Sequence, residues 1–338
     1  MPYNGALTVA DVLTNFNGPN YHGLLHKASP EETPFKALIN GIQADTGGGS
    51  VIIGDMTGRH REYEWQFYSL REPDANRQRI DGFKSLQAEN RIREQVKNVI
   101  QTHTESYEVA FERMAQTEQF DGINANQGPN PVTDELGWQG VQALTQVNLD
   151  QELSLLYSTY NLPVDNTTAA RTRGIDEAIT TNVTDAGGDP LKWSTLVSAM
   201  KGAVEVSGKK IGEGLVAMMN TDAMEQISNE FAAKNLEPRD RMIYGVAVQT
   251  VVTPFGPLNF LYNRHVKQGE VFGLNPTSLR TWHRFVPPHD DVPGGITFTY
   301  TLARAGNATE KAIYSSVGLE YGLEKHHFKI QNLETSAS

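Results

Sequence analysis

The sequence predicts a mixed α+β fold with a helical middle and a strand-rich end. Three observations lead to this prediction. Apolar and polar residues alternate in a run that begins at Glu62, and apolar residues recur at helical spacing over residues 134–158. After residue 246, short Val-, Thr- and aromatic-rich runs are separated by Pro- and Gly-rich turns. The 338 residues are enough to bury a sizeable core and correspond to about two domains.

Residues 1–58 are predicted to form an arm. They contain a Ser29-Pro30 turn and three consecutive glycines within residues 46–50. Such a loop-rich segment buries little apolar surface on itself, so we expect it to lie against something else.

The next segment is predicted to be a long hairpin. Over residues 62–68, Tyr63, Trp65 and Phe67 share one face of a half-buried strand. A polar stretch follows, and residues 95–106 form a second extended run. An isolated hairpin is only marginally stable in water, so this one is expected to need a neighbouring surface.

The charged tip of this hairpin, residues 71–84, has two interpretations. A stretch of mixed charge is usually a solvated loop. Alternatively, its alternating charges dock on a neighbouring subunit and fix the register between the two.

Residues 134–158 are predicted to form the longest helix. Thr133 is a candidate N-cap, and Asp134 and Glu135 suit the positive end of the helix dipole. The residues predicted to form its apolar face are Trp138, Val141, Leu144, Leu149, Leu153 and Leu156.

The other predicted elements are shorter. Helices are expected from Asp189-Pro190 to about residue 206, and from a Thr221 or Asp222 cap to about residue 233. The expected strands are residues 215–219, 246–252, 257–262, 271–274, 279–285, 296–302 and 311–319.

Composition excludes several classes of protein. The net charge is −11, and no basic cluster of the kind that neutralises phosphates is present, so a nucleic-acid reader is not expected. The chain has no cysteine, which removes disulfides, thiolate metal sites and cysteine nucleophiles. No apolar run reaches the roughly 18 residues of a membrane span, and no signal-peptide pattern begins the chain. We expect a soluble protein with no membrane partner.

Three short motifs approach known sites, and each has a simpler interpretation. Residues 202–210 resemble a phosphate-binding loop, but Lys210 stands where Ser or Thr would bind magnesium. His22 and His26 have ligand spacing without a third ligand nearby, and residues 121–128 lack the ligand spacing of a calcium loop. We predict no catalytic residue, no cofactor and no metal site, and therefore no enzyme.

The order of parts, together with short motifs, resembles a known family. The motifs are Tyr63-Glu64-Trp65, Arg171-Thr172-Arg173-Gly174, Thr253-Pro254-Phe255-Gly256 followed by Asn263-Arg264, Leu279-Arg280, Tyr300-Thr301-Leu302 with Asn307, and Gly318-Leu319. In this order and spacing they are similar to the major capsid protein of tailed double-stranded-DNA bacteriophages, which has the Hong Kong 97-type fold. The resemblance covers nearly the whole chain.

The resemblance implies a division of the chain and a set of contacts. The parts are an N-terminal arm (1–58), an E-loop (59–106), a peripheral domain with a long spine helix (107–170), an axial domain (171–284) and returning peripheral strands (285–338). The intersubunit contacts expected from the E-loop are Tyr63, Trp65 and Phe67 on its apolar face and Arg71, Glu72, Asp74, Arg77, Arg79, Asp81 and Lys84 at its polar tip.

The resemblance also implies a function. The chain would assemble as pentamers and hexamers into an icosahedral shell around the phage genome, in the host cytoplasm, and would reside in the virion. The expected partners are further copies of itself, scaffold, portal and decoration proteins, and packaged DNA by non-specific proximity. Two alternatives stay open: an encapsulin-type compartment shell, and a soluble two-domain enzyme with an acidic binding cleft.

Overall fold

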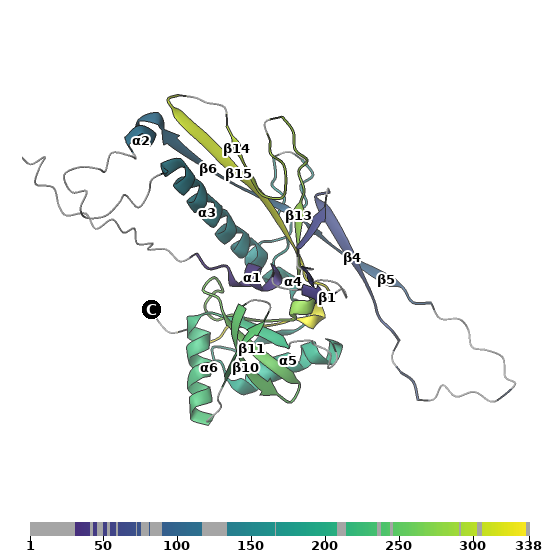
Figure 1. Ribbon diagram of the computed structural model, residues 1–338. Helices are drawn as coiled ribbons and strands as arrows, with labels where there is room; N and C mark the ends of the chain where they lie inside the picture. The colour runs from purple at the N-terminus through teal and green to yellow at the C-terminus, as the bar shows by residue number, and fades with distance from the viewer. Residues whose placement is uncertain are drawn as a thin grey trace, which may run out of the picture.

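The structure, a computed structural model, confirms the predicted α+β fold. Two packed parts form a body, and a hairpin projects from it (Figure 1). The residues that the structure describes are 31–40, 43–45, 50–52, 55–58, 60–71, 73–75, 81, 90–116, 134–165, 167–207, 214–234, 238–243, 246–290, 292–302 and 306–335.

A seven-stranded mixed sheet forms one part of the body, with the strand order β7-β16-β12-β8-β11-β10-β9. The bounds in that order are Val183–Asp185, Phe328–Gln331, Val271–Leu274, Leu215–Met219, Gly256–Tyr262, Val246–Thr253 and Arg239–Ile243. Every residue of the central strand β8 is buried. A continuously apolar strand is typical of a sheet that is covered on both faces.

The core lies on both sides of this sheet because the side chains of β8 alternate between its faces. The odd-numbered residues of β8 pack with helices α5 and α6, and its even-numbered residues pack with α1 and the end of α3. These helices are α1 (Pro34–Asn40), α3 (Glu135–Tyr157), α5 (Trp193–Ser207) and α6 (Thr221–Lys234).

A five-stranded sheet forms the second part, with β14, β15, β13 and β3 in order and β6 paired to β15. The bounds are Phe298–Thr301 for β14, Ala308–Glu320 for β15, Arg280–Arg284 for β13, Asp55–Gly58 for β3 and Gln101–Ala110 for β6. Strand β15 pairs with β14 and β13, and with β6 over ten residue pairs. Helix α3 packs across β6 and β15 through Ala143, Val147 and Ile313.

The other described elements are short. They are β1 (Gln43–Asp45) paired with β2 (Ser50–Ile52), β4 (Glu62–Tyr68) paired with β5 (Arg93–Val99), α2 (Phe111–Gln116), α4 (Ile175–Ala178), η4 (Pro276–Ser278) and η5 (Glu324–His326). Within the described ranges, no helix combines the length and apolar character needed to cross a membrane.

Most of the predicted strands are confirmed. Strands β4, β8 and β12 have the predicted bounds, and β10 and β11 form the predicted hairpin. The predicted run 95–106 is instead two strands, β5 and β6, separated at Ile100. Helix α5 begins at Trp193, later than the predicted Asp-Pro start.

The helix caps differ from the prediction. Asp134 Oδ1 accepts a hydrogen bond from Gly137 N at 3.0 Å and caps α3. The predicted cap, Thr133, lies outside the described residues. At the start of α6, Asn220 Oδ1 accepts from Ala223 N at 3.0 Å, so the cap precedes the two residues predicted for it.

Helix α3 buries a different face from the predicted one. Among the apolar residues predicted to face the core, only Leu156 is buried, and Val141 is 60% exposed. The buried face includes Gln151, whose Nε2 donates to Ser315 Oγ at 2.7 Å. Because a hydrogen-bonded polar side chain is stable in a core, the apolar pattern alone indicated the wrong side of the helix.

A buried carboxylate holds α1 on α3. Glu152 accepts hydrogen bonds from Phe35 N at 2.9 Å, Lys36 N at 2.8 Å and Asn263 Nδ2 at 2.7 Å. Burial raises the pKa of Glu152, and these three hydrogen bonds oppose the rise. Residues 31–40 of the predicted arm therefore lie against the body of their own subunit.

The predicted domain boundaries stay a prediction, and two pairings cross them. Strand β16, assigned to the peripheral part, pairs with β12 and β7 in the seven-stranded sheet. Strand β3, assigned to the arm, pairs in parallel with β13. Pairing between segments far apart in the sequence is not visible in local patterns.

Acidification is expected to destabilise the fold through His327. This fully buried imidazole accepts from Asn275 N at 3.1 Å and donates to Tyr321 O at 2.8 Å. Burial lowers the pKa of His327 to about 4, from 6.5 for an exposed histidine. The unfolded chain therefore binds a proton that the folded chain does not, and stability falls as pH falls from 6.5 towards 4.

The measurement is the free energy of unfolding in urea across this pH window. We expect His327 to contribute a loss of about 3 kcal/mol. The variant His327→Gln keeps a donor and an acceptor but has no titrating group, so its curve should be flatter. Equal losses for the two proteins would show that His327 is not responsible.

Candidate functional site: the projecting hairpin and its base

The hairpin of β4 and β5 is paired from Glu62 and Val99 at its base to Tyr68 and Arg93 at its outer end. On its exposed side, Lys97 Nζ lies 3.3 Å from Glu62 Oε1 across the two strands. Cross-strand pairs of this kind stabilise a hairpin modestly. The paired strands project away from the body (Figure 1).

Aromatic side chains fix β4 to the body. The ring of Tyr63 stacks on Trp282 of β13 with centroids 5.0 Å apart, and Trp65 meets Tyr321 edge-on at 5.0 Å. Trp65 Nε1 also donates to Gly322 O at 2.7 Å. Burial raises the pKa of both Tyr63 and Tyr321, so both phenols are neutral near neutral pH.

These contacts change what the predicted apolar face of the hairpin does. Tyr63 is only 7% exposed and Trp65 is partly buried, both against their own subunit. Tyr63 therefore has little surface left for another subunit. Phe67, further along the strand, is partly exposed. Contact of these residues with a second copy stays a prediction.

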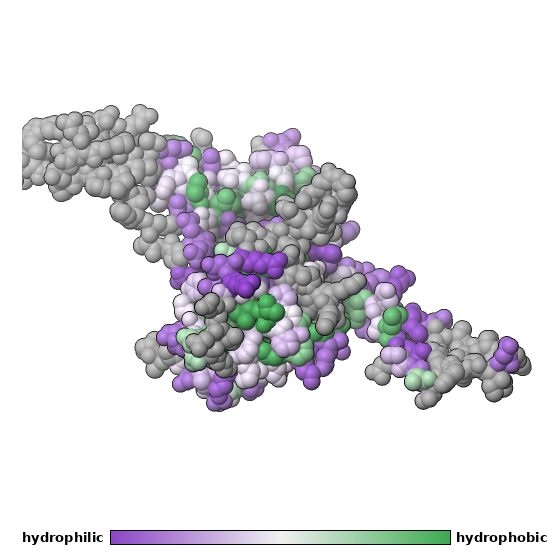
Figure 2. Space-filling view, turned by 60° about the horizontal axis from the view of Figure 1, so that its bottom comes forward, coloured by the Kyte–Doolittle hydropathy of each residue, from purple (hydrophilic) through white to green (hydrophobic). Residues whose placement is uncertain are grey.

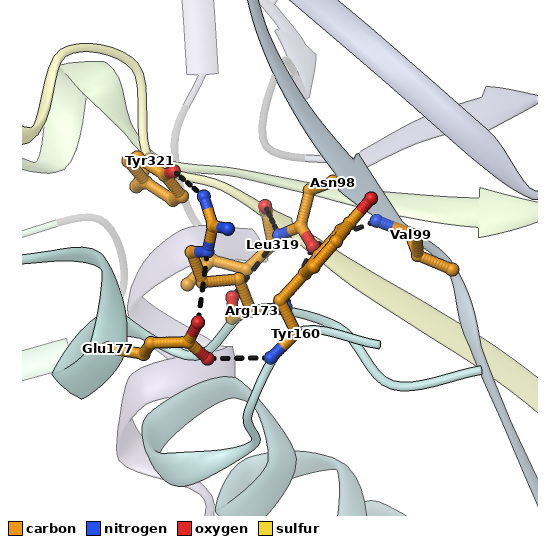
Figure 3. Close-up of polar contacts among 7 residues, drawn as sticks. All are labelled: Asn98, Val99, Tyr160, Arg173, Glu177, Leu319 and Tyr321. Atoms are coloured by element: carbon orange, nitrogen blue, oxygen red, sulfur yellow. Dashed lines mark hydrogen bonds and ion pairs between the residues drawn. The ribbon is translucent and has the colours of Figure 1, made fainter. Parts of the chain in front are cut away.

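Asn98 fixes β5 to the body. Its side chain is fully buried and makes four hydrogen bonds. Nδ2 donates to Leu319 O at 2.7 Å and to Arg173 O at 3.2 Å, while Oδ1 accepts from Arg173 N at 2.7 Å and Val99 N at 2.8 Å. One amide therefore joins the hairpin, the end of β15 and the segment before α4 (Figure 3).

The side chain of Arg173 extends this polar cluster. Its Nη1 donates to the Tyr321 hydroxyl at 3.3 Å, and its Nε lies 3.4 Å from Glu177 Oε1. The guanidinium also lies 4.8 Å from the centre of the Tyr160 ring, and Glu177 accepts from Tyr160 N at 2.6 Å (Figure 3). Arg173 thus connects α4 to the aromatic group that holds Trp65.

Replacement of Gly318 by alanine is expected to displace Tyr63. A Cβ added at Gly318 would lie 2.7 Å from the Tyr63 hydroxyl and 2.8 Å from a ring carbon. Overpacking of this kind costs about 1–3 kcal/mol, which urea unfolding of Gly318→Ala should show. Gly306→Ala is the control, because a Cβ there meets nothing within 4 Å. Equal stability of the two variants would contradict the close packing.

The outer part of the hairpin exposes apolar side chains. Tyr68 is 66% exposed, Leu70 75% and Ile92 80%. Apolar and hydrophilic residues both lie on the hairpin surface where it leaves the body (Figure 2). Single exposed apolar residues are common on protein surfaces, whereas several on one projecting element are typical of a surface that contacts another molecule.

The predicted polar contacts are only partly described. Arg71, Asp74 and Asp81 are exposed. Those outside the described residues are Glu72, Arg77, Arg79 and Lys84. The structure therefore places part of the charged tip in solvent.

A groove of about 840 Å³ separates the hairpin from the body. Phe67 and Leu70 line it from the hairpin, and Val206, Lys325 and His326 line it from the body. Both apolar and charged groups therefore face this space. In the part of the chain that the structure describes, no group of three or more His, Asp or Glu side chains could hold a metal ion.

Sequence reasoning missed two groups of residues here. Leu70 and Ile92 flank the charged tip, and their apolar character beside so many charges was a usable signal. Asn98 gave a weaker signal, because it is an amide side chain next to two apolar residues, Val99 and Ile100. Arg173 was noted only as part of a motif, and its partners are distant in sequence.

Comparison with known proteins identifies a family for this chain. The family model described as SU10 major capsid protein matches residues 8–334. No curated protein sequence matches the chain.

Solved structures show the fold. The capsid asymmetric unit of cyanophage A-1(L) is similar at a TM-score of 0.65 and 9% identity, covering 97% of this chain and 100% of that one. The structure from Microbacterium phage Oxtober96 has a TM-score of 0.57 and 11% identity, and the match covers 97% of this chain and 99% of that one. The holo-SrpI encapsulin complex from Synechococcus elongatus PCC 7942 has a TM-score of 0.54 and 10% identity, and the match covers 85% of this chain and 88% of that one. The predicted Hong Kong 97-type fold is confirmed.

Proposed function

The chain belongs to the SU10 major capsid protein family, and from this premise we propose that it builds the icosahedral head of a tailed bacteriophage. Its role is structural, as a subunit of a capsid shell. In the proposed assembly, pentamers and hexamers of this chain enclose the double-stranded DNA genome. No catalytic step is part of this proposal.

One observation carries the proposal: the hairpin projects from the body with exposed apolar side chains that its own subunit does not cover. Leu70 and Ile92 are the clearest examples. A two-stranded hairpin is only marginally stable in water without a neighbouring surface. In this hairpin, the base is packed on its own subunit and the outer part is exposed. A second copy of the chain is the partner that a shell provides.

The proposed mechanism divides the hairpin into an anchored and a contacting part. Tyr63 and Trp65 anchor the base within the subunit. Phe67 and the exposed apolar residues beyond it would bury surface on a neighbour, which drives association. The polar tip would fix the register through Arg71, Glu72, Asp74, Arg77, Arg79, Asp81 and Lys84.

Further partners belong to the same proposal. Scaffold, portal and decoration proteins would contact the shell during or after assembly in the host cytoplasm. Contact with packaged DNA would be non-specific, because a net charge of −11 disfavours tight binding of phosphates. The mature location would be the virion.

The testing measurement is the native mass of the purified chain, with negative-stain microscopy of the same fractions. Shells or rings of five and six subunits support the proposal. A monomer or dimer at every concentration, also after co-expression with the proteins encoded beside it, would contradict it.

A compartment shell of the encapsulin type is the second candidate, because an encapsulin complex shares the fold. The contents of purified shells distinguish the two candidates. Nucleic acid inside, or terminase and portal genes nearby, indicates a phage head. Enclosed cargo protein without these genes indicates a compartment.

A further inference from the structure

We propose that five residues at the base of the hairpin set the angle at which it leaves the body, with Arg173 and Trp65 as positioning residues. We call this set the joint: Trp65, Asn98, Arg173, Glu177 and Tyr321. The inference rests on the proposed function, because the angle matters to a shell only if the hairpin contacts another subunit.

Asn98 holds strand β5 at one point. Both hydrogens and the oxygen of its amide are in use, with bonds to Leu319, Arg173 and Val99. Any displacement of this buried amide leaves buried backbone groups without partners, which is costly. Asn98 is paired across the hairpin with Tyr63, which stacks on Trp282, so these contacts form a single fixed point about which the hairpin can rotate.

The second connection restricts that rotation. Trp65 on β4 donates to Gly322 O at 2.7 Å and contacts the Tyr321 ring. The Tyr321 hydroxyl accepts from Arg173, which in turn pairs with Glu177 of α4. Strand β4 is therefore joined to α4 through a series of side chains. Removal of Arg173 interrupts this series and leaves Asn98 in place.

The two connections differ in how easily they change. Asn98 is fully buried, whereas the Arg173 side chain is 30% exposed and its polar contacts measure 3.3 and 3.4 Å. Partly exposed ion pairs of this kind contribute little to stability. The Arg173 connection is thus the part of the joint through which the angle can vary without unfolding.

Hairpin length amplifies a change at the joint. Six residues separate the base from Tyr68, or about 20 Å of strand. A rotation of about 10° at the base moves Tyr68 by about 3.5 Å. That distance equals a van der Waals contact of about 3.5–4 Å, so it is enough to remove one contact with a neighbouring subunit.

The experiment measures the angle directly, and the chain suits it because it has no cysteine. Spin labels are attached at Gln66→Cys on the hairpin and Lys201→Cys on α5, two exposed positions. Double electron–electron resonance then gives the distribution of distances between the two labels. Gln66 is four residues, or about 14 Å of strand, from the base, so a rotation of about 10° moves it by about 2 Å. Arg173→Ala should therefore broaden the distribution by about 2 Å.

Two further variants accompany Arg173→Ala. Trp65→Phe keeps an aromatic ring but loses the donor to Gly322, so it should broaden the distribution as well. Arg113→Ala is the matched control, because Arg113 pairs with Glu135 at 3.3 Å away from the hairpin. The control should keep the distribution of the starting protein.

Shell microscopy adds the functional readout. Arg173→Ala should give shells with a wider spread of diameters than Arg113→Ala gives. An unchanged distance distribution in both Arg173→Ala and Trp65→Phe would overturn the proposal. Shells of uniform diameter from a variant whose distance distribution is broadened would also overturn it. If Arg173→Ala does not fold, Trp65→Phe decides. If the variants broaden the distance distribution but neither they nor the starting protein form shells, the result supports the role of the joint and contradicts the proposed function.

Discussion

Deletion of residues 71–84 is expected to leave a folded subunit that closes no shells. The deleted residues lie beyond the last paired residues of the hairpin, Tyr68 and Arg93. The contacts that anchor the base, through Tyr63 and Asn98, are retained. The unfolding curve should therefore stay close to that of the full chain, while microscopy shows no closed shells.

A variant with the order of residues 71–84 scrambled is the matched control. It keeps the length and net charge of the tip but changes the positions of its charges. If neither variant closes shells, the order of the charges determines the register. If only the scrambled variant closes shells, the length of the tip is sufficient. Normal shells from the deletion would show that the tip has no role in assembly.

Replacement of Asn98 by alanine is expected to cost about 4 kcal/mol in the free energy of unfolding. The alanine leaves Leu319 O, Arg173 N and Val99 N buried without this partner. Each lost partner of a buried group costs about 1–3 kcal/mol, which is large beside a typical stability of about 5–15 kcal/mol.

The matched control is Asn161→Ala. Asn161 is also an asparagine that bonds a backbone carbonyl, donating to Ala169 O at 2.8 Å, but this bond is exposed. We expect a loss below about 1 kcal/mol there, because water replaces the lost partner. Urea unfolding of both variants tests the difference. Similar losses at the two positions would mean that Asn98 does not fix the hairpin.

Local sequence patterns predicted most of the fold. The alternation from Glu62 to Tyr68 became β4 with the predicted bounds, and the apolar run of β8 became the central strand of a covered sheet. These predictions succeed because burial on one or both faces of a strand leaves a direct trace in the sequence. The prediction for α3 failed where Gln151 and Glu152 are buried, because their partners lie on other elements.

The candidate site could be predicted only in outline. Alternation identified the hairpin, but not which of its aromatic residues stay within the subunit. Tyr63 stacks on Trp282, and Asn98 bonds Leu319, each more than two hundred residues away. Long-range partners of this kind depend on the whole topology. The structural role of the Arg171–Gly174 motif depends on such partners, because Arg173 lies beside Asn98 and Tyr321.

The pairing of β15 with β6 determines how the subunit responds to mechanical load. Their ten residue pairs run antiparallel, with hydrogen bonds perpendicular to the strands. A pull along the strand axis loads all of these bonds in shear at once, whereas a pull across the open end of a hairpin separates one pair at a time. In the proposed phage head, outward pressure from the packaged genome would stretch the shell wall. The long β6–β15 ladder gives this subunit a direction in which such tension is shared.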